Sequence, residues 1–153
     1  MVNYFAFYKA ESNPTGLSGT VGGAISNTIL LPRLNTLFAK REVSSSLSVT
    51  QYRKFFIKQT QNVTLTGVYL EMANAEHSGH ITFATGTATD SIANATIAPS
   101  GITFSGNFTT SVPIQGTTIS GTSIPVWLKQ VIPAASGDDD YVAFQLRIVG
   151  TIV

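Results

Sequence analysis

Residues 91–128 read SIANATIAPSGITFSGNFTTSVPIQGTTISGTSIPVWL, and they include no Asp, Glu, Lys or Arg. Apolar residues recur along this stretch, and Ser, Thr, Gly and Asn fill many of the positions between them. An ordinary soluble surface is about 25–35% charged, so a stretch of this length without charge either packs in a core or meets another protein. It also lacks the acids and bases on which most catalysis depends. The stretch therefore predicts a structural protein whose polar face contacts a permanent neighbour.

The whole chain shares this low charge. Only 11% of its 153 residues are charged, against about 25% in an average domain. Thr, Val, Ile, Phe and Tyr, which favour pleated surfaces, are abundant, and 13 Gly and 6 Pro supply breaks between elements. A chain of this length predicts one domain. The composition therefore predicts an all-β fold.

Alternation of apolar and polar residues predicts the strands. The apolar residues change face at Gly67, which predicts a bulge, and Pro125 predicts an edge strand or a strand start. Short antiparallel strands separated by turn residues are typical of a β-sandwich, either jelly-roll or Ig-like. The expected strands lie within residues 52–57, 63–72, 81–83, 102–108, 123–131 and 141–148.

The first third of the chain has a different character. Four aromatic residues, Tyr4, Phe5, Phe7 and Tyr8, precede a loop in which four of the residues from 16 to 23 are Gly. Such a loop holds neither a helix nor a regular strand. We therefore expect residues 1–50 to form an extended N-terminal arm with loops, packed on a sandwich body of residues 51–153 within one domain.

Two clusters contain residue types that bind metals. His77 and His80 are the only histidines, and a zinc site requires three or four converging ligands. Asp138–Asp140 form a carboxylate cluster beside Gly137, but their spacing matches no known calcium loop. Both clusters are typical of solvated turns. No metal and no cofactor is expected.

Other chemistry is poorly represented. The chain has no Cys and no Gly-x-Ser-x-Gly motif, so few nucleophile–base pairs are available and an enzyme is not expected. Residues 53–56 mix basic and aromatic side chains, but a net charge of +1 offers little attraction to nucleic acid. No run of about 18 apolar residues occurs, and residues 1–5 do not resemble a signal peptide. Neither nucleic acid nor a membrane is therefore an expected partner.

Four segments occur in a familiar order. They are residues 22–26 (GGAIS), 35–38 (NTLF), 52–58 (YRKFFIK) and 63–71 (VTLTGVYLE). This order resembles that of small bacteriophage virion proteins, the capsid decoration or cement proteins, which have β-sandwich bodies. The resemblance implies a non-enzymatic structural protein on the outer surface of the capsid, made in the host cytoplasm. It also implies two partners, the major capsid protein and the chain itself as a homo-dimer or homo-trimer.

The same resemblance suggests which residues meet the shell. Aromatic residues and Arg supply most of the binding energy at protein interfaces. Residues 1–60 carry seven basic and two acidic side chains, which suits an acidic partner surface. The expected capsid-binding residues are Tyr4, Phe5, Phe7, Tyr8, Lys9, Arg33, Lys40 and Arg41.

Two alternatives remain open from the sequence. One is a β-module of a phage tail or fibre, which would have the same composition. The other is a carbohydrate-binding β-sandwich that stacks sugars on Trp127, Tyr69 or Tyr141 and holds Ca²⁺ with the carboxylates of residues 138–140.

Overall fold

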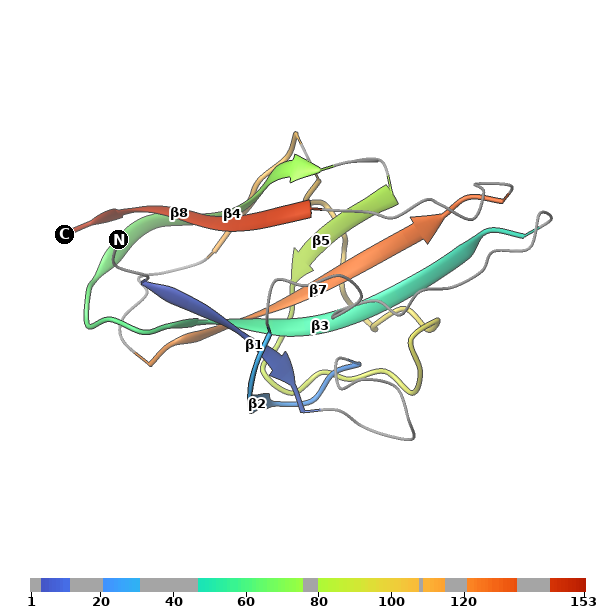
Figure 1. Ribbon diagram of the computed structural model, residues 1–153, viewed down its shortest axis with the longest axis horizontal. Helices are drawn as coiled ribbons and strands as arrows, with labels where there is room; N and C mark the ends of the chain where they lie inside the picture. Colours follow the sequence, from blue (N-terminus) through green and yellow to red (C-terminus); the bar gives the residue numbers. More distant parts are fainter. Residues whose placement is uncertain are drawn as a thin grey trace.

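A computed structural model describes residues 4–11, 21–30, 47–75, 80–107, 109–114, 121–134 and 144–153. Within these residues the regular structure is almost entirely β-strand, and no helix has the length and apolarity of a membrane span. Figure 1 shows the arrangement of the strands. They are β1 (Phe5–Ala10), β2 (Ile25–Ile29), β3 (Val49–Gln59), β4 (Leu65–Ala75), β5 (Ile81–Thr85), β6 (Val112–Pro113), β7 (Ser123–Ile132) and β8 (Phe144–Ile152).

The strands form two antiparallel sheets. The larger sheet has the order β2-β1-β3-β7-β5, and the smaller has the order β6-β4-β8. In Figure 1 the pair β4 and β8 lies above the long diagonal strands β3 and β7. The prediction of an all-β, antiparallel fold is confirmed.

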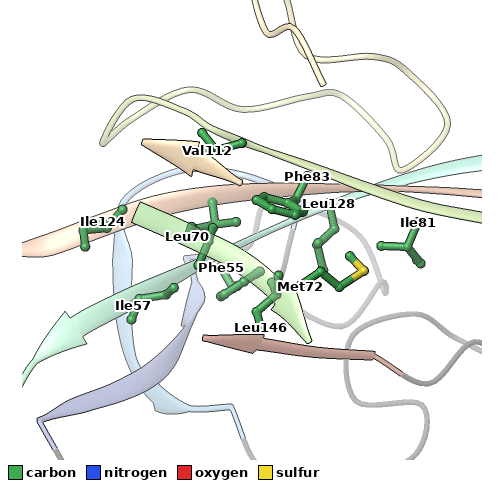
Figure 2. Close-up of a cluster of buried hydrophobic side chains, with 11 residues drawn as sticks. Phe55, Ile57, Leu70, Met72, Ile81, Phe83, Val112, Ile124, Leu128 and Leu146 are labelled. Atoms are coloured by element: carbon green, nitrogen blue, oxygen red, sulfur yellow. The ribbon is translucent and has the colours of Figure 1, made fainter. Parts of the chain in front are cut away.

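The two sheets share one hydrophobic core, which Figure 2 shows in close-up. Side chains alternate along a strand, so one face of β3 contributes Phe55 and Ile57. From the smaller sheet, Leu70 and Met72 of β4 face them. The remaining buried members are Ile81, Phe83, Val112, Ile124, Val126, Leu128 and Leu146.

The opposite face of the larger sheet is covered as well. Tyr52 of β3 and Trp127 of β7 lie on that face, because they alternate with the core residues of the same strands. They pack with Val21, Ile92 and Ala95 from two irregular segments, and residues 102 and 104 add partly buried apolar side chains. Consequently, residues 51–57 of β3 are all buried, one after another.

The cover explains much of the uncharged stretch. Its first described part, residues 91–107, runs mostly as irregular chain over the sheet, and Ile92 and Ala95 point into it. Its last part, residues 123–128, belongs to β7 in the middle of the larger sheet. A charge at these inward positions would have to be desolvated at high cost. Part of the uncharged sequence is therefore explained within one copy of the chain.

Two local predictions are confirmed with a physical reason. The β4–β8 register shifts between Thr66 and Tyr69, and Gly67 adopts a φ of 60°, which is the bulge expected there. Pro125 lies near the start of β7, which is an interior strand and not an edge. The Gly86 N–H donates to the Pro125 carbonyl at 3.0 Å, so the missing N–H of Pro125 points to the side where β5 has already ended.

One predicted strand is wrong. Within 102–107 the chain is irregular apart from an isolated bridge between Gly106 and Phe83. The Phe83 N–H donates to the Gly106 carbonyl at 2.8 Å, and the Gly106 N–H returns a bond at 2.9 Å. Alternation arose here because Ile102 and Phe104 pack down onto the sheet from a covering loop. A loop that lies along a sheet thus imitates the pattern of a strand.

The described part of residues 1–50 does not show an extended arm. Residues 5–10 and 25–29 form β1 and β2, and β1 lies between β2 and β3 in the larger sheet. Residues 12–20 and 31–46 lie outside the described part of the chain. The N-terminal strand is therefore a structural member of the sheet.

Candidate functional site

Three of the four aromatic residues expected to bind the capsid lie on β1, and Tyr4 directly precedes that strand. Phe5 and Phe7 pack against the core between the sheets, and the Phe7 and Phe55 ring centroids are 5.9 Å apart. Both edges of β1 are paired within the chain, with β2 on one side and β3 on the other. Hence the backbone of β1 cannot add to a neighbouring sheet, and these two rings stabilise the fold.

The polar residues beside these rings have the same intermediate exposure as the rings themselves. Tyr4, Tyr8 and Lys9 are half-buried, and the Lys58 ammonium lies 5.8 Å from the Tyr8 ring centroid. Arg33, Lys40 and Arg41, predicted to face an acidic surface, lie outside the described residues. The structure thus brings together only the β1 members of the predicted set.

The predicted metal and sugar residues are mostly outside the described chain. This holds for His77, the carboxylates of residues 138–140 and Tyr141, whereas His80 is half-buried beside β5. Among the described residues, no three His, Cys, Asp or Glu side chains converge on a point. Trp127 is fully buried beneath the covering loop, so its ring cannot stack on a sugar from solvent. Of the three rings expected to stack on sugars, Trp127 is therefore inaccessible, whereas Tyr69 of β4 is half-buried.

A buried polar cluster, which we call the Lys54 cluster, occupies the covered face of the larger sheet. It comprises Lys54 of β3, Trp127 of β7, and Gly23, Thr87 and Asp90 from the covering segments. The Lys54 side chain is 0% exposed and forms an ion pair with the Asp90 carboxylate. Its Nζ also donates to the carbonyls of Gly23 and Asp90, each at 2.9 Å. Four segments of the chain therefore meet at one ammonium group.

Asp90 is held from several sides. Its Oδ2 accepts the Trp127 indole N–H at 3.0 Å and the Thr87 backbone N–H at 3.0 Å. The Thr87 hydroxyl in turn accepts the Asp90 backbone N–H at 3.2 Å. The two side chains thus accept each other's backbone N–H groups reciprocally, which is the hydrogen-bond pattern of a capping box.

Burial and hydrogen bonding act against each other in this pair. Desolvation lowers the pKa of Lys54, although the Asp90 carboxylate works in the opposite direction. Desolvation would raise the pKa of Asp90, but hydrogen bonds from Lys54, Thr87 and Trp127 outweigh it and lower the pKa below its ordinary value. The carboxylate is therefore ionised at neutral pH and supplies the counter-charge that Lys54 needs.

The surrounding backbone leaves no space at this cluster. Gly22 pairs with Ser91, and the Gly23 N–H donates to the Asp90 carbonyl at 2.9 Å. A Cβ at Gly86 would lie 2.6 Å from the Trp127 ring and 2.7 Å from Asp90 Oδ2. A substrate has no access to a lysine enclosed in this way. The cluster is suited to locking the covering loop onto the sheet rather than to catalysis.

Sequence reasoning missed the Lys54 cluster, although two signals were present. Lys54 lies two residues from both Tyr52 and Phe56, so it shares a strand face with two aromatic residues. Asp90 is the last charged residue before the uncharged stretch begins. Charges that remain in an apolar context are usually paired, so these two were candidates for each other.

The exposed surface of the described residues is poor in charge. Of 36 exposed residues, only Glu11 and Arg147 are charged. The Arg147 side chain also forms an ion pair with Glu71 of β4 on the outer face of the smaller sheet. A typical surface of this size would carry roughly 9 to 13 charged residues. Within the described residues, low charge is therefore a property of the exposed surface and not only of the core.

Comparison with protein-family models, curated proteins and solved structures gives no match.

Proposed function

We propose that the chain is a non-enzymatic structural protein of a bacteriophage virion, a capsid decoration or cement protein with a β-sandwich body of jelly-roll or Ig-like type. It would bind the outer shell and stabilise the joints between major capsid subunits. The proposal rests on the resemblance of residues 22–71 to such proteins and on the physical character of the surface.

The charge-poor exposed surface is the observation that carries the proposal. Charged side chains keep a soluble protein apart from its neighbours, and they are costly to desolvate in a contact. Thr, Ser, Asn and Gly can be covered by a partner at much lower cost because they carry no charge to desolvate. In the described part of the chain, two charges among 36 exposed residues suit a protein that functions within a permanent assembly.

The buried charges support the same function. A decoration protein must keep its shape under mechanical load, and it needs no pocket. In the described chain the most enclosed titratable pair, Lys54 and Asp90, holds a loop against a sheet. We infer a rigid scaffold that resists deformation.

The proposal also assigns partner contacts. Phe5 and Phe7 pack against the core, so Tyr4, which precedes β1, and Tyr8 and Lys9 of β1 would meet the shell. Arg33, Lys40 and Arg41 would add positive charge against an acidic capsid surface. Neutralising these four basic residues, Lys9 included, should lower shell occupancy and flatten its dependence on salt. Unchanged occupancy at every salt concentration would reject the basic contact.

The decisive experiment separates heads from tails in the virion whose genome encodes this chain. Mass spectrometry of the two fractions should find the chain with the heads. Particles from a deletion mutant should release DNA at a lower temperature than wild-type particles, and purified protein added back should restore the difference. Recovery of the chain with tails would instead support the tail or fibre module, and its absence from particles would reject both.

A further inference from the structure

The four sheet edges of the described chain differ greatly in how far they are protected. The outer edge of β5 is partly covered, because Phe83 exchanges two backbone hydrogen bonds with Gly106. The edge strand β6 spans only Val112–Pro113, and β2 spans only five residues. In contrast, β8 runs over nine residues and pairs, among the described strands, with β4 alone.

The β8 strand lacks most of the devices that prevent strand addition. Natural edges are protected by charged side chains, above all Lys, by Pro or bulges in the edge strand, or by a helix or loop that covers them. The sequence of β8, FQLRIVGTI, contains no Pro and no Lys. Both register shifts of the β4–β8 pair place the additional residue in β4, so β8 itself runs without a bulge. An edge of this kind is a template for another strand.

The charge distribution on β8 favours a second copy of the same strand. Arg147 is the only charge on the strand, and Glu71 of the neighbouring strand neutralises it. At the end of the strand, Ile152 and Val153 are 51% and 74% exposed. Two copies can therefore approach without net repulsion, and the contact can cover apolar side chains that solvent otherwise surrounds.

We propose that β8 pairs antiparallel with β8 of a second copy around a two-fold axis, joining two three-stranded sheets into one six-stranded sheet. Antiparallel pairing of identical strands is self-complementary, as a two-fold interface requires. Added strands gain backbone hydrogen bonds along their whole length. The occupant of this edge is thus another copy of the chain.

One register of the β8–β8 pair combines extensive pairing with separation of the two arginines. With Val149 opposite its own copy, Arg147 faces Thr151 of the second chain. This register pairs the strand from Leu146 to Ile152 and keeps the two arginines apart. Centring the axis on Arg147 would place like charges directly opposite each other, which destabilises a strand pair.

This pairing specifies how two copies of the chain would associate, as the proposed function expects. Only its location on a capsid rests on that function. A strand-edge contact is smaller than a standard interface, so we expect a dissociation constant on the order of micromolar for the free protein. Copies held side by side on a shell would pair more completely, because their effective concentration is high. Pairing would then link neighbouring decoration sites.

The test uses two matched substitutions, Thr151→Lys on the β8 edge and Thr28→Lys on the exposed β2 edge of the other sheet. Sedimentation equilibrium of the wild-type chain should show a monomer–dimer equilibrium. Thr151→Lys should weaken dimerisation by at least tenfold, and Thr28→Lys should leave it unchanged. Circular dichroism and the unfolding midpoint verify that both variants are folded.

Cross-linking tests the proposed register of the β8–β8 pair separately. Because the chain contains no Cys, Val149→Cys introduces a single thiol, and a short bis-maleimide should cross-link it into a covalent dimer. The matched variant Thr28→Cys should form no covalent dimer, because its thiol lies away from the proposed interface. Failure of Val149→Cys to cross-link would overturn the register.

Three results would overturn the pairing itself. The first is a wild-type chain that stays monomeric at every concentration. The second is a dimerisation constant that Thr151→Lys and Thr28→Lys weaken equally. The third is a chain that never dimerises and yet loses shell binding through Thr151→Lys. The last result would assign the edge to a strand of the shell protein. Dimerisation of the free chain without any capsid binding would instead leave this inference standing and reject the proposed function.

Discussion

The fully buried ammonium group of Lys54 forms an ion pair with the carboxylate of Asp90, whose side chain is 18% exposed, and the two residues lie 36 positions apart. Lys54 comes from an interior strand, and Asp90 comes from the irregular segment that covers it. The Trp127 indole donates to the same carboxylate. The contact therefore joins the sheet to its cover, and its removal tests how far the fold depends on that cover.

We expect Asp90→Ala to lower the free energy of unfolding by about 3–5 kcal/mol, as is typical when one partner of a buried ion pair is removed. The variant leaves the Lys54 charge enclosed without a counter-charge and the Trp127 N–H without its acceptor. Urea denaturation with an unchanged m-value measures the loss. The double variant Lys54→Met/Asp90→Ala should recover part of it, because no unpaired charge remains.

The exposed pair of Arg147 and Glu71 is the matched control for that experiment. Because solvent screens it, Glu71→Ala should cost less than about 1 kcal/mol. Equal losses in Asp90→Ala and Glu71→Ala would mean that the covering loop contributes little to stability.

Acid should weaken the fold through Asp90. Its pKa is lowered in the folded chain, so below about pH 4, near the ordinary value of Asp, the unfolded chain binds more protons at this group. The stabilisation by Asp90 is therefore complete above that pH and is lost as the pH falls through the folded-state pKa. In urea titrations from pH 6 to pH 3, the stability difference between wild type and Asp90→Asn should shrink. Parallel pH profiles would contradict this role.

Gly106→Ala should destabilise the larger sheet. A Cβ at position 106 would collide with the Phe83 ring, and two backbone hydrogen bonds hold Gly106 in place beside Phe83. Overpacking of this kind costs about 1–3 kcal/mol. Gly101→Ala is the control, since a Cβ there meets nothing within 4 Å and only its φ of 72° opposes the change. Thermal unfolding should rank Gly106→Ala as the less stable variant.

Substitutions on β1 should separate fold residues from contact residues. Phe7→Ala should lower stability by about 2–4 kcal/mol, because the ring packs against the core beside Phe55. Lys9→Ala should change stability by no more than about 0.5 kcal/mol, as is usual at accessible positions. An unfolding midpoint unaffected by Phe7→Ala would mean that β1 is an arm that docks only on a partner.

Much of the fold was predictable because its signals are local. The strand around Tyr52–Ile57, the bulge at Gly67 and the strand from residue 123 all follow from alternation and from Gly conformation. The pattern misled at Ile102 and Phe104, whose spacing matches a strand although they belong to a covering loop. Periodicity records which side chains point inward, and it does not record whether the backbone is paired.

The sequence by itself determined that this chain is an all-β protein with little charge and a bulged strand, because a side-chain period of two and the φ of a glycine are properties of neighbouring residues. Only the tertiary structure decided that β1 lies inside the larger sheet, that residues 91–107 cover its second face, and that Lys54 meets Asp90. Those outcomes depend on the path of the chain between distant residues. Pairing and desolvation between remote segments set their free energy, and no local pattern encodes them.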